Sequence, residues 1–73
     1  DLGRVEIPSG CSVDGRTLRT MAVRERTGAT VVALERDGAV RPNPPPDLEL
    51  RAGDVLLVYG TGEQLSSVRE LLA

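Results

Sequence analysis

The sequence predicts a single small α+β domain over residues 1–73, of element order β-α-β-β-β-α, with helices packed on a small β-sheet. Three observations predict this class. Short β-branched runs are separated by turn residues, and the dipeptide Asp37-Gly38 joins two of these runs as in a β-hairpin. Two further segments carry apolar residues at helical spacing, and no internal repeat is present.

The first elements are a strand and a helix. Residues 2–7 form an extended apolar segment that closes in a Pro-Ser-Gly sequence, which is typical of a strand. Thr17 is expected to cap a helix running from Leu18 to Thr27, and Gly28 is expected to end it. The buried stripe of this helix is predicted to contain Leu18, Met21 and Ala22.

A hairpin is predicted next. Residues 29–36 form a β-branched run, Asp37-Gly38 supplies the turn, and residues 39–41 return as a second strand. Pro42 and the following Asn-Pro-Pro-Pro stretch are expected to stop that strand, because proline cannot donate to a strand ladder.

The last elements are a strand and a helix. Residues 55–59 are apolar at every position, which favours a central strand covered on both faces. Gly60 ends this strand, and Thr61 with Gln64 forms a predicted capping box for a final helix. The buried stripe of that helix is predicted to contain Leu65, Val68 and Leu72, with Leu71 beside it.

The short length favours association with a second copy of the chain. A domain of this size buries only about 60% of its unfolded surface and needs reinforcement. Cys11 is the sole cysteine, so no internal disulfide can form, and without histidine a structural zinc site is not expected. The lone thiol suits a reducing compartment. Because the chain begins at Asp1 and its only methionine is Met21, we expect it to be a piece of a longer protein.

Composition argues against several functional classes. The net charge of -2 does not favour binding to a phosphate backbone, and the single aromatic residue, Tyr59, cannot form a stacking surface for bases. Binding to a nucleic-acid polymer is therefore not expected. The longest apolar run, residues 55–59, is far shorter than a membrane span, so direct membrane insertion is not expected.

An enzyme is not expected either, and no catalytic residue is assigned. The chain has no histidine for proton transfer, and Cys11 has no histidine partner. Asp14, Asp37 and Asp54 lie at turns, where aspartate caps backbone groups. No metal site is assigned, because these acids lack the spacing of a calcium motif.

The order and spacing of several short motifs resemble one known family. The pieces are Gly15, Thr17-Leu18, Gly28, Val31-Val32-Ala33, Asn43-Pro44 and the segment Leu50-Arg51-Ala52-Gly53-Asp54-Val55-Leu56-Leu57-Val58-Tyr59-Gly60. Together they are similar to the TrkA-C domain, the C-terminal domain of regulators of conductance of potassium (RCK_C). The resemblance implies a cytoplasmic homodimer that controls a membrane potassium channel, a potassium transporter or a cation/proton antiporter. It also implies cyclic di-AMP as a ligand, since several members bind this nucleotide at the dimer interface; no cofactor is implied.

The resemblance also implies the ligand-binding residues, which are Val23, Arg24, Thr30, Val31 and Pro44. The two valines and the proline are expected to pack against adenine, Arg24 to pair with a phosphate, and Thr30 to meet the base edge. Members of the family often have asparagine at the Thr30 position, so base recognition is expected to differ here.

A helical wheel for residues 18–27 gives an independent reason to consider this region. It places Val23 opposite the buried stripe, as an apolar side chain on the outer face where a symmetric interface could form. It places Glu25 on the buried stripe, although we expect this carboxylate to point to water from the last turn. Two alternatives remain open: a dimerisation module of a transporter regulator with no small ligand, and a site for another nucleotide or a cation.

Overall fold

The computed structural model describes residues 1–10 and 15–72, and the predicted order of strands and helices is confirmed with one change. The elements are β1 (Leu2–Glu6), α1 (Leu18–Met21), α2 (Val23–Thr27), β2 (Thr30–Arg36), β3 (Ala39–Pro42), β4 (Val55–Tyr59) and α3 (Gly62–Leu71). The predictions for Cys11 and Asp14 fall outside the described residues. In the described part of the chain, no helix is long and apolar enough to cross a membrane.

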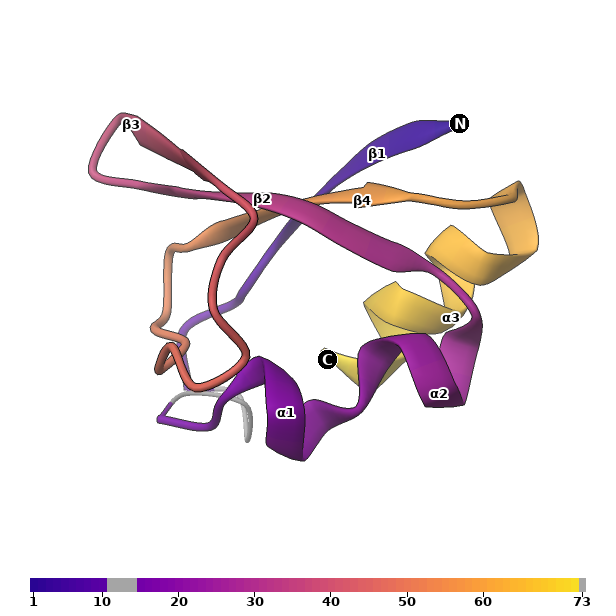
Figure 1. Cartoon of the computed structure of the whole chain (residues 1–73), viewed down its shortest axis with the longest axis horizontal. Coiled ribbons are helices and arrows are strands. Elements are labelled where there is room, and N and C mark those ends of the chain that lie inside the picture. Colours follow the sequence, from indigo (N-terminus) through magenta and orange to yellow (C-terminus); the bar gives the residue numbers. More distant parts are fainter. Residues whose placement is uncertain (11–14, 73) are drawn as a thin grey trace.

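The four strands form one antiparallel sheet in the order β1-β4-β2-β3 (Figure 1). The apolar strand β4 is central, as predicted, and its Leu56 is paired with Val5 of β1 and with Leu34 of β2. The β2–β4 register shifts between Val31 and Ala33, which marks a β-bulge near the start of β2.

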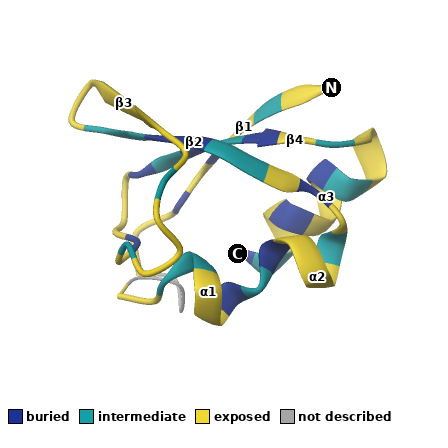
Figure 2. Cartoon of the chain, in the orientation of Figure 1, coloured by how far each residue is buried: buried dark blue, intermediate teal, exposed yellow. Residues whose placement is uncertain are grey.

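All the helices lie on one face of the sheet, so β4 is covered on that face only (Figure 2). Leu56 and Val58 of β4 are fully buried, whereas Tyr59 is 61% exposed. The predicted burial of both faces is therefore wrong. The core between sheet and helices is apolar throughout and contains Val5, Ile7, Met21, Val23, Ala29, Leu34, Leu50, Leu56, Val58, Leu65, Val68 and Leu72.

The predicted helix from Leu18 to Thr27 is wrong in one respect, because it is divided at Ala22. Ala22 adopts φ 49° and ψ 47°, the left-handed conformation, and serves as C-cap of α1 and N-cap of α2. Its N–H donates to the carbonyl groups of Leu18 (3.1 Å) and Arg19 (3.3 Å), which closes α1. The chain direction then changes, and this change moves Val23 from the outer face to the core.

The turn and cap predictions are confirmed. Asp37 (φ 52°) and Gly38 (φ 79°) both have positive φ, as a type I′ hairpin turn requires. Pro42 ends β3, which is an edge strand and so tolerates a proline without an N–H. The hydroxyl of Thr61 accepts from Gln64 N while Gln64 Oε1 accepts from Thr61 N, which completes the capping box of α3.

Candidate ligand-binding site

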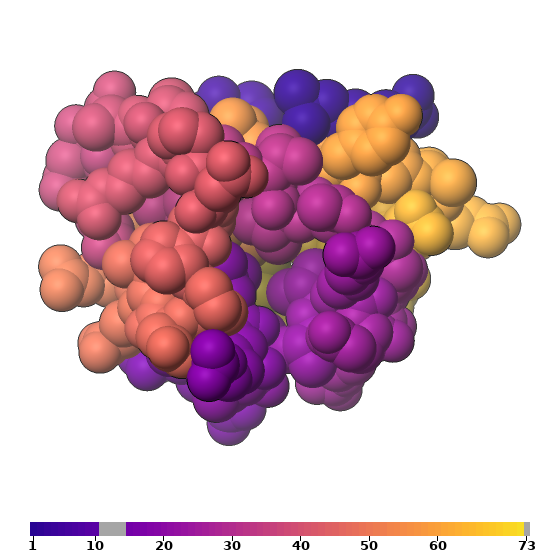
Figure 3. All heavy atoms as spheres, in the orientation of Figure 1, coloured from indigo at the N-terminus to yellow at the C-terminus, as the bar shows by residue number. Residues whose placement is uncertain are grey.

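An open hollow of about 460 Å³ lies between the two short helices, the start of β2 and the proline-rich segment after β3. We call it the α1–α2 hollow, and Figure 3 shows the face on which these segments meet. The five predicted site residues all line it. The full lining is Leu18, Arg19, Ala22, Val23, Arg24, Glu25, Thr30, Val31, Pro44 and Pro46.

The end of α2 is fixed in a way that brings Val23 and Thr30 to the same hollow. The Thr27 hydroxyl donates to Val23 O (2.7 Å) and accepts from Ala29 N (3.1 Å), so it connects the helix to the residue just before β2. Gly28 has φ 81° and donates its N–H to the carbonyl of the residue four positions earlier (2.8 Å). This tight C-cap turns the chain directly into β2.

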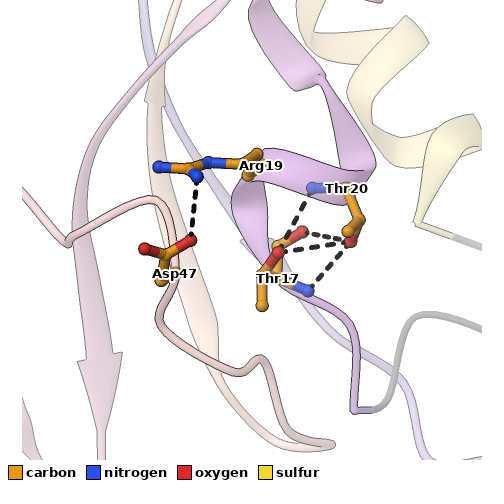
Figure 4. Close-up of polar contacts among 4 residues, drawn as sticks. All are labelled: Thr17, Arg19, Thr20 and Asp47. Carbon is orange, nitrogen blue, oxygen red and sulfur yellow. Dashed lines mark hydrogen bonds and ion pairs between the residues drawn. The ribbon is translucent and has the colours of Figure 1, made fainter.

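The opposite wall is held by α1 and the proline segment (residues 43–48). Thr17 and Thr20 form a capping box at the start of α1, which confirms Thr17 as the N-cap (Figure 4). Arg19 N then donates to Pro46 O at 3.0 Å, and Asn43 N donates to Val32 O at 3.0 Å. The proline segment is thus attached by backbone hydrogen bonds to both α1 and β2.

The apolar part of the hollow is continuous with the core. Val23 is only 4% exposed and belongs to the core cluster, so its predicted exposure on the outer face is wrong. Val31 and Pro44 are half-buried, and Val31 packs against the same cluster. Rigid apolar groups of this kind suit the flat face of a base or another planar ring.

Charged groups of both signs lie at the rim. Arg24 is exposed and makes no ion pair within residues 1–10 and 15–72, so its guanidinium is available to an anion. Glu25 is exposed, as expected, and its place on the buried stripe of the wheel is wrong because the helix is interrupted before it. Arg19 pairs with Asp47 at 3.5 Å. The hollow therefore combines an apolar floor with two arginines and one glutamate.

Another hollow, of about 540 Å³, lies between α2 and α3 and is mainly polar in its lining. It is lined by Arg16, Met21, Arg26, Thr27, Ser67, Glu70 and Leu71. Among the residues that the structure describes, no three His, Cys, Asp or Glu side chains are grouped to hold a metal ion. The α1–α2 hollow is the better candidate, because it offers an apolar surface and cationic groups together.

Sequence reasoning missed part of the lining. The sequence pattern places Leu18 on the core stripe alone and does not point to Arg19 or Pro46, yet all three line the hollow. Helical spacing could not have placed Arg19 beside Val23, because the helix is divided at Ala22 between them. Pro46 belongs to the same proline run as Pro44 and could have been included with it.

The fold is that of a small α+β domain, and its α1–α2 hollow combines an apolar surface with two arginines and one glutamate. The sequence matches the TrkA-C domain over residues 2–73, so the chain belongs to this family. It is 35% identical over 57 residues to potassium channel protein 1 of Methanocaldococcus jannaschii, covering 78% of this chain and 17% of that relative. The chain thus spans about one sixth of the length of that relative.

Solved RCK_C domains share the fold. The RCK_C domain dimer of S. agalactiae BusR, solved in complex with c-di-AMP, has a TM-score of 0.88 and 21% identity, over 97% of this chain and 88% of that chain. The RCK C domain of the potassium transport protein KtrA, also in complex with c-di-AMP, has a TM-score of 0.88 and 18% identity, over 96% and 80% of the two chains. At these identities the likeness extends to the fold alone.

Proposed function

We propose that this chain is a non-catalytic, cytoplasmic regulatory domain that binds cyclic di-AMP at the interface of a homodimer. In this proposal it controls a potassium channel, a potassium transporter or a cation/proton antiporter. Membership of the TrkA-C family and the similarity to a potassium channel protein support the regulatory role. The two structural relatives solved with c-di-AMP support the choice of ligand.

The observation that carries the proposal is that five residues from separate elements line one hollow. Val23 and Arg24 come from α2, Thr30 and Val31 from β2, and Pro44 from the proline segment. In the proposed complex the three apolar side chains pack against adenine. Arg24 donates to a phosphate oxygen, and the Thr30 hydroxyl donates to or accepts from the base edge.

The symmetry of the ligand supports a homodimer. Cyclic di-AMP contains two identical halves, and a twofold interface presents the same hollow to each half. The hollow is open to solvent on the isolated chain. In the proposed dimer, a second copy would cover it. Enclosure strengthens the pairing between arginine and phosphate, because electrostatic interactions are stronger away from water.

Calorimetric titration of the folded chain with cyclic di-AMP tests this proposal. We expect heat of binding at tens of micromolar protein, one dinucleotide per two chains, and a rise in melting temperature with ligand concentration. Cyclic di-GMP serves as the control nucleotide, since it has the same phosphates and a different base edge. A folded sample that gives no heat and no thermal shift with cyclic di-AMP would contradict the ligand and favour a dimerisation module without one.

A further inference from the structure

Arg19 lies where the α1–α2 hollow meets the proline segment. Its guanidinium Nη1 is 3.5 Å from Asp47 Oδ1, and the two side chains are 65% and 74% exposed (Figure 4). Arg19 also lines the hollow, together with Arg24. One arginine is thus available to an anion, and the other already has a carboxylate partner beside the same hollow.

The side-chain pair is not what fixes the proline segment in place. The backbone N–H of Arg19 donates to Pro46 O, and Leu48 N donates to Pro45 O, each at 3.0 Å. The capping box of Thr17 and Thr20 holds the start of α1 without involving the Arg19 side chain. Removal of the charge at Arg19 or Asp47 should therefore leave this wall of the hollow folded.

The pair is also weak enough to exchange partners. It consists of one long contact between exposed groups, and such pairs contribute little in water and are screened by salt. A phosphate offers arginine two parallel acceptors and forms shorter, stronger hydrogen bonds than this contact. An anionic ligand in the hollow can therefore compete with Asp47 for the guanidinium.

We propose that Arg19 is a second anion-binding residue of the hollow, and that Asp47 is an internal competitor which holds it while the site is empty. This inference rests on the proposed function, because it concerns the same hollow. When a phosphate-bearing ligand binds, Arg19 leaves Asp47 and pairs with the ligand. Asp47 thereby lowers the affinity of the hollow for the ligand without contacting the ligand itself.

Isothermal titration of four proteins with cyclic di-AMP tests the proposal: wild type, Asp47→Asn, Arg19→Gln and the double variant. Asp47→Asn is expected to tighten binding by about threefold to fivefold, because the competing charge is lost. Arg19→Gln is expected to weaken binding about tenfold. The double variant should bind like Arg19→Gln alone, since Asp47 acts only through Arg19.

Matched controls come from a second ion pair among the described residues, Arg4–Glu35 at 3.2 Å, neither member of which lines the hollow. Glu35→Gln and Arg4→Gln change the net charge as Asp47→Asn and Arg19→Gln do, and they should leave the affinity unchanged. The proposal is overturned if Asp47→Asn fails to tighten binding, or if each control shifts the affinity as much as its partner variant.

Inorganic pyrophosphate, used as a second probe, separates this proposal from the proposed function. If wild type binds no cyclic di-AMP, the proposed function fails. The anion role of Arg19 would still be established if pyrophosphate binds most tightly to Asp47→Asn, less tightly to wild type and least tightly to Arg19→Gln. If neither wild type nor Asp47→Asn binds either probe, both proposals fall.

Discussion

Arg36 and Asp54 form a two-pronged ion pair between the end of β2 and the residue before β4. Arg36 Nε lies 2.9 Å from Asp54 Oδ1, and Arg36 Nη2 lies 2.7 Å from Oδ2. The side chains are only 13% and 3% exposed. Asp54 Oδ2 also accepts from Arg51 N at 2.9 Å, and Arg36 Nη2 donates to Glu49 O at 2.8 Å. This pair therefore ties the turn before β4 to the far end of β2.

Removal of the Asp54 carboxylate should destabilise the fold strongly. Asp54→Asn is expected to lower the free energy of unfolding by about 2 kcal/mol, because the half-buried Arg36 loses its charged partner. The measurement is urea unfolding at pH 7. Glu35→Gln, which breaks an exposed pair, should lower it by less than about 1 kcal/mol. Equal losses in the two variants would show that burial of the Arg36–Asp54 pair does not matter.

Acid should weaken the same contact. Hydrogen bonding from Arg36 lowers the pKa of the Asp54 carboxyl below its ordinary value, although burial opposes the shift. The folded pKa lies below that of an unfolded aspartate, about 3.9. The contribution is therefore complete above about pH 4 and is lost as the pH falls through the lower, folded pKa. The stability difference between wild type and Asp54→Asn should shrink below pH 4, and a constant difference down to pH 2 would contradict this.

Substitution of Ala22 by glycine and by valine should change the free energy of unfolding in opposite directions. Its φ of 49° is unfavourable for a residue with a Cβ and more so for a β-branched one. Ala22→Gly is expected to raise the free energy of unfolding by about 0.5–1 kcal/mol, and Ala22→Val to lower it by at least as much. Thermal unfolding measures both. If glycine destabilises the chain, the left-handed conformation is not populated in solution.

A side chain at Gly28 should destabilise the fold. A Cβ there would lie 2.7 Å from Gln64 Nε2, and φ is 81°. Gly28→Ala is expected to lower the free energy of unfolding by about 1–2 kcal/mol, since it displaces the Gln64 cap and strains the backbone. Gly62→Ala is the control, because nothing lies within 4 Å of its added Cβ and alanine favours the helix. It should be neutral or stabilising in the same urea assay.

Arg24 should matter for ligand binding and little for folding. Arg24→Ala is expected to weaken cyclic di-AMP binding by about 1.5–3 kcal/mol, the range of a hydrogen bond to a charged group, while the proposed dimer stays intact. Arg26→Ala is the control, since Arg26 lies on the same helix but lines the other hollow. Calorimetry measures affinity and sedimentation measures association. Dissociation of the Arg24→Ala dimer would show that Arg24 is structural.

Most of the fold could be predicted because its signals are local. The hairpin at Asp37-Gly38 and the caps at Thr17, Gly28 and Thr61 each depend on the residue type at one turn or helix end. The break at Ala22 could not be predicted, because alanine is the strongest helix former and rarely takes a positive φ. The residue type at position 22 therefore gives no signal of the break.

The ligand-binding role of the five residues stays a prediction, and the structure shows only where they lie. The family resemblance named five residues, and the structure brings all of them to one hollow. The wheel placed Val23 outside and Glu25 inside, and both positions were wrong because the wheel assumed one continuous helix. The Arg19–Asp47 contact joins residues that are 28 positions apart in the sequence. No local sequence pattern predicts it.

Val23 serves two purposes at once, since it is part of the core and part of the wall that a ligand would touch. Mutations that reshape the hollow at this position also change how well the core is filled. A substitution of Val23 therefore changes ligand specificity and folding stability together. A relative that acquired a different ligand through this position would also need compensating changes in the core. Thr30 and Glu25 are exposed and free of that constraint. Divergence of ligand preference within the family should accumulate first at such rim positions.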